Sequence, residues 1–256
     1  MTLLEVEALH ASVAAREVVR GVDLRVPGGE VHVVMGPNGS GKSTLAHALM
    51  GRPGTTVTSG SIRIDGTELV GVPSWRRAQA GLFLALQQPI EVPGVLVETA
   101  LREALRAEGE AAEAAEAEAA EFDLSGRLLE EAAAIGFDER FLRRSLNVDL
   151  SGGERKRNEV VQLAVLRPKF AVLDEIDSGL DVDAVRAVAQ RIERATSEWG
   201  LGVVAVTHFH RLLRELRADK VYVLVDGRIV ASGGPDLAEE LEHTGYREYG
   251  DDSDVA

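Results

Sequence analysis

The sequence predicts an α/β protein in which helices cover a parallel sheet, with a small antiparallel sheet and an inserted helical lobe. Three observations predict this class. Continuous apolar runs such as "EVHVVM", "FAVLDE" and "GVVAVTH" alternate with helical patterns, as they do in parallel sheets covered by helices. Short alternating patterns begin the chain. Alanine and glutamate dominate its middle part, which favours helix there.

The N-terminal part contains two kinds of pattern. Apolar residues alternate in "LLEVEALH", "VDLRV" and "SIRIDGTEL", with turn sequences between the runs, which predicts antiparallel strands. The β-branched run "EVHVVM" interrupts this series and is followed by glycines and then by the helical pattern "KSTLAHALM". This order predicts a buried strand, a loop and a helix.

The chain is expected to form a single domain over residues 1–256. A helical pattern rich in Ala and Glu extends from about 97 to 148, and we interpret it as an inserted helical subdomain. Residues 1–96 and 149–256 then supply the α/β core with its antiparallel β subdomain. Near the C-terminus, "KVYVLVDGRIVASG" alternates around a "DG" turn, which predicts a hairpin.

Charge and composition exclude several function classes. With 42 acidic against 28 basic side chains and a net charge of -14, the surface is expected to repel nucleic acid and anionic lipid. The chain has no cysteine, which excludes disulfides and thiolate-held metal centres. No apolar run has the roughly 20 residues of a membrane span, and the N-terminus has acids where a signal peptide is basic. We expect a cytoplasmic protein with no nucleic-acid partner and no direct membrane insertion.

The strongest chemical signal is "GPNGSGKST", which fits the phosphate-loop pattern of two glycines around four residues followed by Lys and Ser. Glycines allow backbone amides to converge on a triphosphate, and the next helix presents its positive end. Lys42 is expected to reach the β- and γ-phosphates, and Ser43 to ligate Mg²⁺. The predicted ATP-binding residues of this loop are Gly36, Pro37, Asn38, Gly39, Ser40, Gly41, Lys42, Ser43 and Thr44.

Acidic residues crowd the end of the apolar run "FAVLDEIDSGLD". A magnesium nucleotide needs a carboxylate at the end of a neighbouring strand, and Asp174 is placed for it. Glu175 projects differently and is expected to hold the attacking water; a simple loop cap is the structural alternative for Asp174. We assign Asp177 only local hydrogen bonding in the turn, and Asp181 a helix cap.

A third motif, "LSGGE", begins 20 residues before this acidic run, with Ser151, Gly152 and Gly153 expected just ahead of a helix. A hydroxyl and bare amides at a helix start point towards an anion. Taken alone, the motif is better explained by an ordinary N-cap with flexible glycines.

Four motifs occur in a fixed order along the chain: the phosphate loop, "LSGGE", an apolar run ending in "DE", and a histidine after the next strand. The sequence therefore resembles the ATP-binding cassette (ABC) ATPases over nearly its whole length. The resemblance implies a P-loop NTPase fold with a RecA-like core and hydrolysis of ATP with Mg²⁺. Gly36 to Thr44 correspond to Walker A, Asp174 to the Walker B aspartate and Glu175 to the catalytic glutamate.

The resemblance implies roles for further residues. Ser151–Glu154 correspond to the signature motif, which in this family binds the γ-phosphate held by another subunit, so that hydrolysis implies a head-to-tail ATP-bound dimer. Gln87 corresponds to the glutamine that senses Mg²⁺ and the γ-phosphate, with Gln88 as the alternative. His208 is expected to contact the γ-phosphate, and Asp181 to lie in the D-loop between subunits.

One feature departs from the family pattern. Transporter ATPases commonly stack adenine on an aromatic side chain from the first strands, but this chain has no Phe, Tyr or Trp before Trp75. The stretch from His10 to Arg16 would have to contact the adenine instead. We therefore expect weak discrimination between ATP and GTP.

The chain reads "DEIDSGLD" where many transporter motors read "DEPTSALD". Together with "QQPIEVPGV", "LNVDLSGGERKRNEVVQLAVL" and "THFHRLL", it resembles the SufC-type ATPases of the SUF iron–sulphur cluster assembly machinery. The resemblance implies SufB-like and SufD-like scaffold partners and a transient ATP-dependent contact between two copies of the ATPase. The alternative is the nucleotide-binding subunit of an ABC transporter, whose catalytic residues are the same.

Two segments are candidates for partner contacts. Pro89–Val95 is an apolar, proline-stiffened stretch after Gln87, which is either a docking segment or a packed surface loop. The acidic run Glu108–Glu121 is either a solvated helix face or a patch for a basic partner.

Overall fold

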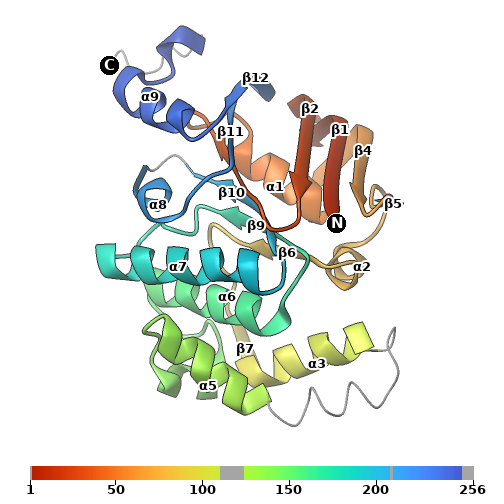
Figure 1. Cartoon of the computed structure of the whole chain (residues 1–256). Coiled ribbons are helices and arrows are strands. Elements are labelled where there is room, and N and C mark those ends of the chain that lie inside the picture. The colour runs from red at the N-terminus through yellow and green to blue at the C-terminus, as the bar shows by residue number, and fades with distance from the viewer. Residues whose placement is uncertain (1, 110–123, 208–209, 250–256) are drawn as a thin grey trace.

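The computed structural model describes residues 2–109, 124–207 and 210–249. Its first sheet is antiparallel and has the strand order β2-β1-β4-β5 (Figure 1). The strands are β1 (Leu3–Val13), β2 (Arg16–Pro27), β4 (Thr55–Ile64) and β5 (Thr67–Glu68). The antiparallel sheet predicted from the three alternating patterns is confirmed.

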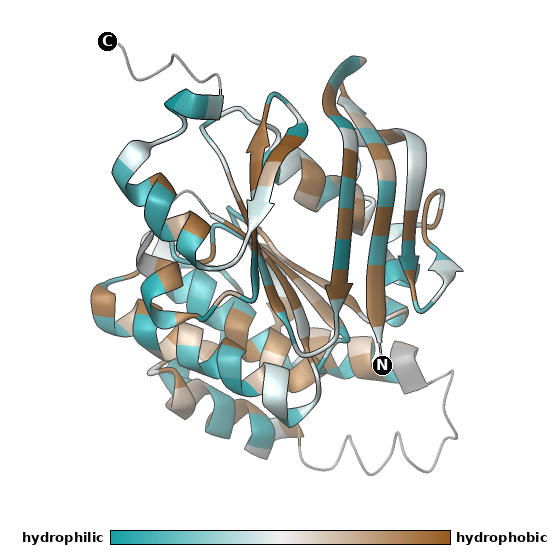
Figure 2. Cartoon of the chain, turned by 45° about the horizontal axis from the view of Figure 1, so that its top comes forward, coloured by the Kyte–Doolittle hydropathy of each residue, from teal (hydrophilic) through white to brown (hydrophobic). Residues whose placement is uncertain are grey.

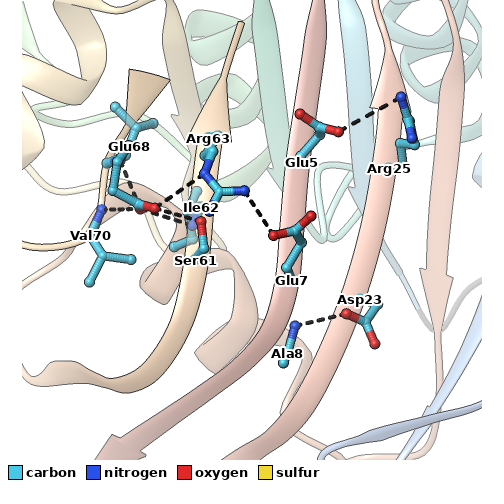
Figure 3. A network of polar contacts seen from close by, with 11 residues as sticks. Glu5, Glu7, Ala8, Asp23, Arg25, Ser61, Ile62, Arg63, Glu68 and Val70 are labelled. Carbon is cyan, nitrogen blue, oxygen red and sulfur yellow. Dashed lines mark hydrogen bonds and ion pairs between the residues drawn. The ribbon is translucent and has the colours of Figure 1, made fainter. Parts of the chain in front are cut away.

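Alternation along these strands separates a polar face from a buried one. On the polar face, Glu7 pairs with Arg63 at 2.8 Å, Arg63 lies 3.6 Å from Glu68, and Glu5 lies 3.8 Å from Arg25 (Figure 3). The apolar residues of β1 on the other face are fully or almost fully buried. One face of this sheet is therefore solvated, and the other packs on the core.

The second sheet has six strands in the order β12-β11-β3-β10-β9-β6. The strands are β3 (Val31–Met35), β6 (Leu82–Ala85), β9 (Phe170–Asp174), β10 (Gly202–Val206), β11 (Lys220–Val225) and β12 (Arg228–Gly233). All neighbours are parallel except β11 and β12, which form the predicted hairpin. The carboxyl ends of β3, β6, β9 and β10 therefore meet at one edge, where ligands bind in such sheets.

Helices cover both faces of the six-stranded sheet. Helix α1 (Lys42–Met50) lies between the two sheets, where Leu45 and Leu49 are fully buried among residues of both. The other face carries α6 (Gly152–Leu166), α7 (Val182–Glu198), α8 (His210–Glu215) and α9 (Asp236–Thr244). The hydrophobic interior of these layers is visible in Figure 2, where the central strands are mostly brown. None of the helices in the described ranges combines the length and apolar composition of a membrane span.

The middle of the chain is less uniformly helical than predicted. It contains α3 (Val97–Gly109), α5 (Leu124–Ala134) and a 3₁₀ turn (Glu139–Arg143). Instead of continuing as helix to 148, the chain forms β8 (Ser145–Leu146), which pairs with β7 (Val92–Leu96). Gly136 at φ +63° and Asn147 at φ +60° interrupt the helical conformation, so propensity alone overestimated its extent. Most of the acidic run Glu108–Glu121 lies outside the described residues.

The helical lobe is joined to the α/β core by a buried ion pair. Arg191 of α7 donates from Nε and Nη2 to the carboxylate of Glu131 of α5, at 2.5 and 2.8 Å. Arg191 is 3% exposed, and its guanidinium also lies over the ring of Trp199. A bidentate, shielded pair of this kind holds the two helices in one orientation.

Candidate nucleotide site

The phosphate loop joins β3 to α1, as the sequence predicted. A Cβ atom at Gly36 would lie 2.0 Å from the carbonyl oxygen of Leu224, so only glycine fits there. Gly39 and Gly41 have φ values of +80° and +106°, which side chains strongly disfavour. The glycines therefore allow the loop to wrap closely and present its amides at the start of α1.

Lys42 is 5% exposed and folds over its own loop. Its Nζ donates hydrogen bonds of 2.8 Å to the carbonyl oxygens of Gly36 and Pro37. Burial lowers the pKa of Lys42, while the charges of Glu175 and Asp174 oppose this effect. The ammonium is thus held at the mouth of the loop, where a phosphate would be a further anionic partner.

Asp174 ends β9 and is fully buried. Ser43 Oγ donates to Asp174 Oδ1 at 3.1 Å, whereas Oδ2 accepts no hydrogen bond from any residue that the structure describes. Burial raises the pKa of Asp174. The Ser43 hydroxyl and the Asp174 oxygen that accepts no hydrogen bond fit Mg²⁺, because this ion takes oxygen ligands. Mg²⁺ is commonly bound by one or two carboxylates together with substrate phosphates.

Glu175 follows Asp174 at φ +50°, a conformation uncommon outside glycine. Its backbone amide still donates to Val206 of β10 at 2.9 Å. Its side chain accepts a 2.7 Å hydrogen bond from Gln87 Nε2, and only 8% of the residue is exposed. The structure thus brings together the predicted water-positioning carboxylate and the predicted sensor glutamine.

The signature motif begins α6, but its glycines lie inside the first helical turn. The sequence placed Gly152 and Gly153 ahead of the helix; the structure makes Ser151 the N-cap, because Ser151 and Glu154 form a reciprocal capping box. Ser151 and Gly152 are exposed, and a Cβ atom at Gly153 would lie 2.9 Å from the carbonyl oxygen of Gly179. The motif therefore lies on the surface and packs closely against the 178–181 turn.

Comparisons with known proteins agree with this geometry. The family model described as "ABC transporter" matches residues 19–178. The chain belongs to this family. A "Probable ABC transporter ATP-binding protein" of Streptococcus pyogenes serotype M3, SpyM3_0208, is 44% identical over 246 residues, covering 96% of this chain and 94% of the relative.

Two solved structures share the fold. "Structure of ATP binding subunit of ABC transporter" is 27% identical with a TM-score of 0.73 and covers 95% of both chains. "Dimeric Structure of MJ0796, a Bacterial ABC Transporter Cassette" has a TM-score of 0.75 at 21% identity, over 91% of this chain and 98% of that one, and shows likeness of fold alone. The protein is thus an ABC ATPase with the ABC cassette fold.

Two further acids of this ABC ATPase, Asp177 and Asp181, follow β9 along the chain. The helix cap predicted at Asp181 is confirmed, since its side chain accepts from the amide of Ala184 at 2.8 Å. Asp177 was expected to bond only within its turn. Asp177 does accept within the turn, from the amide of Leu180, but its carboxylate also accepts from Thr207 Oγ1 at 3.3 Å and connects the turn to the end of β10, because the parallel strands bring these ends together.

His208 lies outside the described residues, so its predicted contact with the γ-phosphate stays a prediction. Sequence reasoning missed a group of buried polar residues on α6, among them Lys156, Asn158 and Glu159. In the sequence these residues are indistinguishable from an ordinary solvated face, since "ERKRNE" is a run of charged and polar residues.

Proposed function

We propose that this ABC ATPase is the SufC-type subunit of a SUF iron–sulphur cluster assembly complex. The observation that carries the proposal is the segment "LNVDLSGGERKRNEVVQLAVL", residues 146–166, which resembles that subfamily well beyond the signature motif. The structure supports the proposal in that four residues of this segment outside the signature motif, Asn147, Lys156, Asn158 and Glu159, are all buried and hydrogen-bonded.

In this proposal the residues that bind the nucleotide and the residues that promote hydrolysis have separate tasks. The Walker A loop and Lys42 bind the phosphates of ATP, and Ser43, Gln87 and Asp174 are the residues that would hold Mg²⁺. The ion, when bound, neutralises charge on the phosphate oxygens. Glu175 positions the attacking water, and Gln87, 2.7 Å from it, orients its carboxylate. His208 contacts the γ-phosphate.

The signature motif is proposed to bind the ATP of a second copy. Its exposed residues Ser151 and Gly152 are accessible to such a partner. Phosphates shared across the interface favour the closed pair, and hydrolysis lets it reopen. We propose that the core, residues 1–96 and 149–256, and the helical subdomain, about 97–148, carry this movement to SufB-like and SufD-like scaffold proteins. Pro89–Val95 is the proposed docking segment; Ile90 within it is 57% exposed.

A transporter subunit is the second candidate. The name of the Streptococcus pyogenes relative, "Probable ABC transporter ATP-binding protein", favours it. Both candidates use the same catalytic residues and differ in the protein that the ATPase binds.

A replacement experiment in the protein's own cells separates these candidates. Cells that make only the Glu175→Gln chain should lose activity of iron–sulphur enzymes, and treating their extracts with iron and sulphide under reducing conditions should restore it. Excess iron in the medium should not restore it. Normal iron–sulphur enzyme activity, or recovery with iron alone, would contradict the assembly proposal and favour transport.

A further inference from the structure

Helix α6, which begins with the signature motif, is hydrogen-bonded to the segment that carries Gln87. Glu159 Oε1 accepts from the amide of Leu86 at 2.9 Å, and Lys156 Nζ donates to the carbonyl oxygen of the same residue. Both backbone groups of Leu86, the residue before Gln87, are therefore held by one helix. Glu159 and Leu86 are 73 residues apart in the sequence.

The same helix holds the far end of the segment. Asn158 Nδ2 donates to Asn147 Oδ1 at 2.8 Å, and Asn147 Nδ2 donates to the carbonyl oxygen of Ile90 at 3.0 Å. Arg155 pairs with Glu91 at the surface. The 86–91 segment is thus bound to α6 at its beginning and at its end.

The contacts of Lys156, Asn158 and Glu159 are almost completely shielded from water, unlike the Arg155–Glu91 pair. Lys156, Asn158 and Glu159 are 2%, 0% and 6% exposed. Burial raises the pKa of Glu159 to about 7, against the opposing effects of the Leu86 amide and Lys156. Buried charged groups are costly unless paired, and loss of one partner leaves the other uncompensated. The cluster therefore favours one arrangement of α6 and the segment.

The cluster is also connected to the hydrolytic residues. Lys156 Nζ donates to the carbonyl oxygen of Asp174 at 3.1 Å, and Gln87, next to Leu86, donates to Glu175. Within three turns of its start, α6 thus contacts the backbone of Leu86 and of Asp174. These residues directly precede Gln87 and Glu175.

We propose that Glu159 is a positioning residue for Gln87: by fixing the Leu86 amide it holds the Gln87 side chain against Glu175. A shift of α6, when its signature motif meets the ATP of a second copy, is then transmitted to the sensor glutamine of its own chain. The two half-sites of one chain are coupled through Leu86. The inference rests on the proposed role of Gln87.

A double-mutant cycle of kcat tests this coupling, with Glu159→Ala and Gln87→Ala alone and combined. Glu159→Ala should lower kcat by about tenfold or more with the KM for ATP changed by less than about threefold, because the phosphate loop is untouched. In the Gln87→Ala background, Glu159→Ala should have little further effect. Glu159→Gln, whose amide oxygen also accepts from the Leu86 amide, should recover most of the activity.

Glu131→Ala is the matched control, because it removes another carboxylate that holds a helix of the lobe without contacting residues 86–91. Its effect on kcat should add to that of Gln87→Ala. If Glu159→Ala does not fold, Lys156→Met/Glu159→Met, which removes both buried charges together, replaces it.

Additive effects of Glu159→Ala and Gln87→Ala, or wild-type kcat in Glu159→Ala, would overturn the inference. If Gln87→Ala itself left kcat unchanged, the proposed role of Gln87 would be wrong, and the inference would fail with it. The three results are distinguishable because each single variant is measured separately.

Discussion

Asp174, Lys42 and Glu175 are charged side chains held out of water at one sheet edge. Asp174 is fully buried, and Lys42 and Glu175 are 5% and 8% exposed. Such groups lower stability unless they are compensated, and here the compensation is incomplete, because Asp174 Oδ2 accepts no hydrogen bond within the described part of the chain. This imbalance is expected of a site that completes its bonding with a ligand.

Lys42→Ala should weaken nucleotide binding itself. Loss of the ammonium removes the cation that would pair with the β- and γ-phosphates, and we expect at least about a tenfold rise in the Kd for ATP, or about 1.4 kcal/mol. Titration with a fluorescent ATP analogue measures it. Lys169→Ala is the control, since Lys169 pairs with Asp65 at the surface. Equal affinities of the Lys42→Ala and Lys169→Ala chains would contradict the phosphate-loop assignment.

Glu175→Gln should retain ATP and lose hydrolysis. The new amide keeps an oxygen that accepts from Gln87 Nε2, so the local structure should persist, but it is no longer a base for the attacking water. We expect kcat to fall by roughly a hundredfold or more with the Kd for ATP within about threefold of the parent. Turnover near the parent rate would show that another group positions the water.

At the scale of elements, the ends of helices place the functional residues. Asp181, which follows β9 and its acid Asp174 along the chain, caps α7, and Ser151 caps α6 with the signature glycines in its first turn. A capping side chain satisfies amides that would otherwise be unpaired at the helix start. Stability and site geometry therefore depend on the same residues.

Asp181→Ala should lower the free energy of unfolding by about 1 kcal/mol, because the amide of Ala184 loses its acceptor. Asp181→Asn should preserve most of the stability, since Asn also caps helices well. Urea unfolding followed by circular dichroism measures both. A loss of stability in Asp181→Asn as large as in Asp181→Ala would show that the charge matters more than the cap.

The elements differ in how well the sequence predicted them. Strand β3, the phosphate loop and α1 were predictable, because a β-branched run, glycines and a helical pattern follow one another. The pairing of β7 with β8 was not, since it joins two short segments with no alternating pattern. The burial of Glu159 was also unpredictable, because it depends on where Leu86 lies in the folded chain and not on residues near 159.

At the scale of the molecule, the six-stranded sheet separates two hydrophobic cores, and α1 belongs to the core on the side of the antiparallel sheet. One contains the antiparallel sheet, and the other contains the helices that carry the signature motif and the lobe. The phosphate loop, Asp174 and Glu175 lie at the carboxyl ends of β3 and β9, and the signature motif lies at the start of α6 (Figure 1). We propose that a bound partner senses a movement of the lobe and α6 relative to the central sheet.

The proposed work of this ATPase in an assembly complex can be tested directly. The direct measurement is to purify the tagged chain gently from its own cells with detergent present and to identify the proteins bound to it by mass spectrometry. We expect two mutually similar scaffold proteins without membrane spans, in stable proportion to the ATPase. Polytopic membrane proteins in their place would contradict it and identify the chain as a transport motor, with every catalytic assignment unchanged.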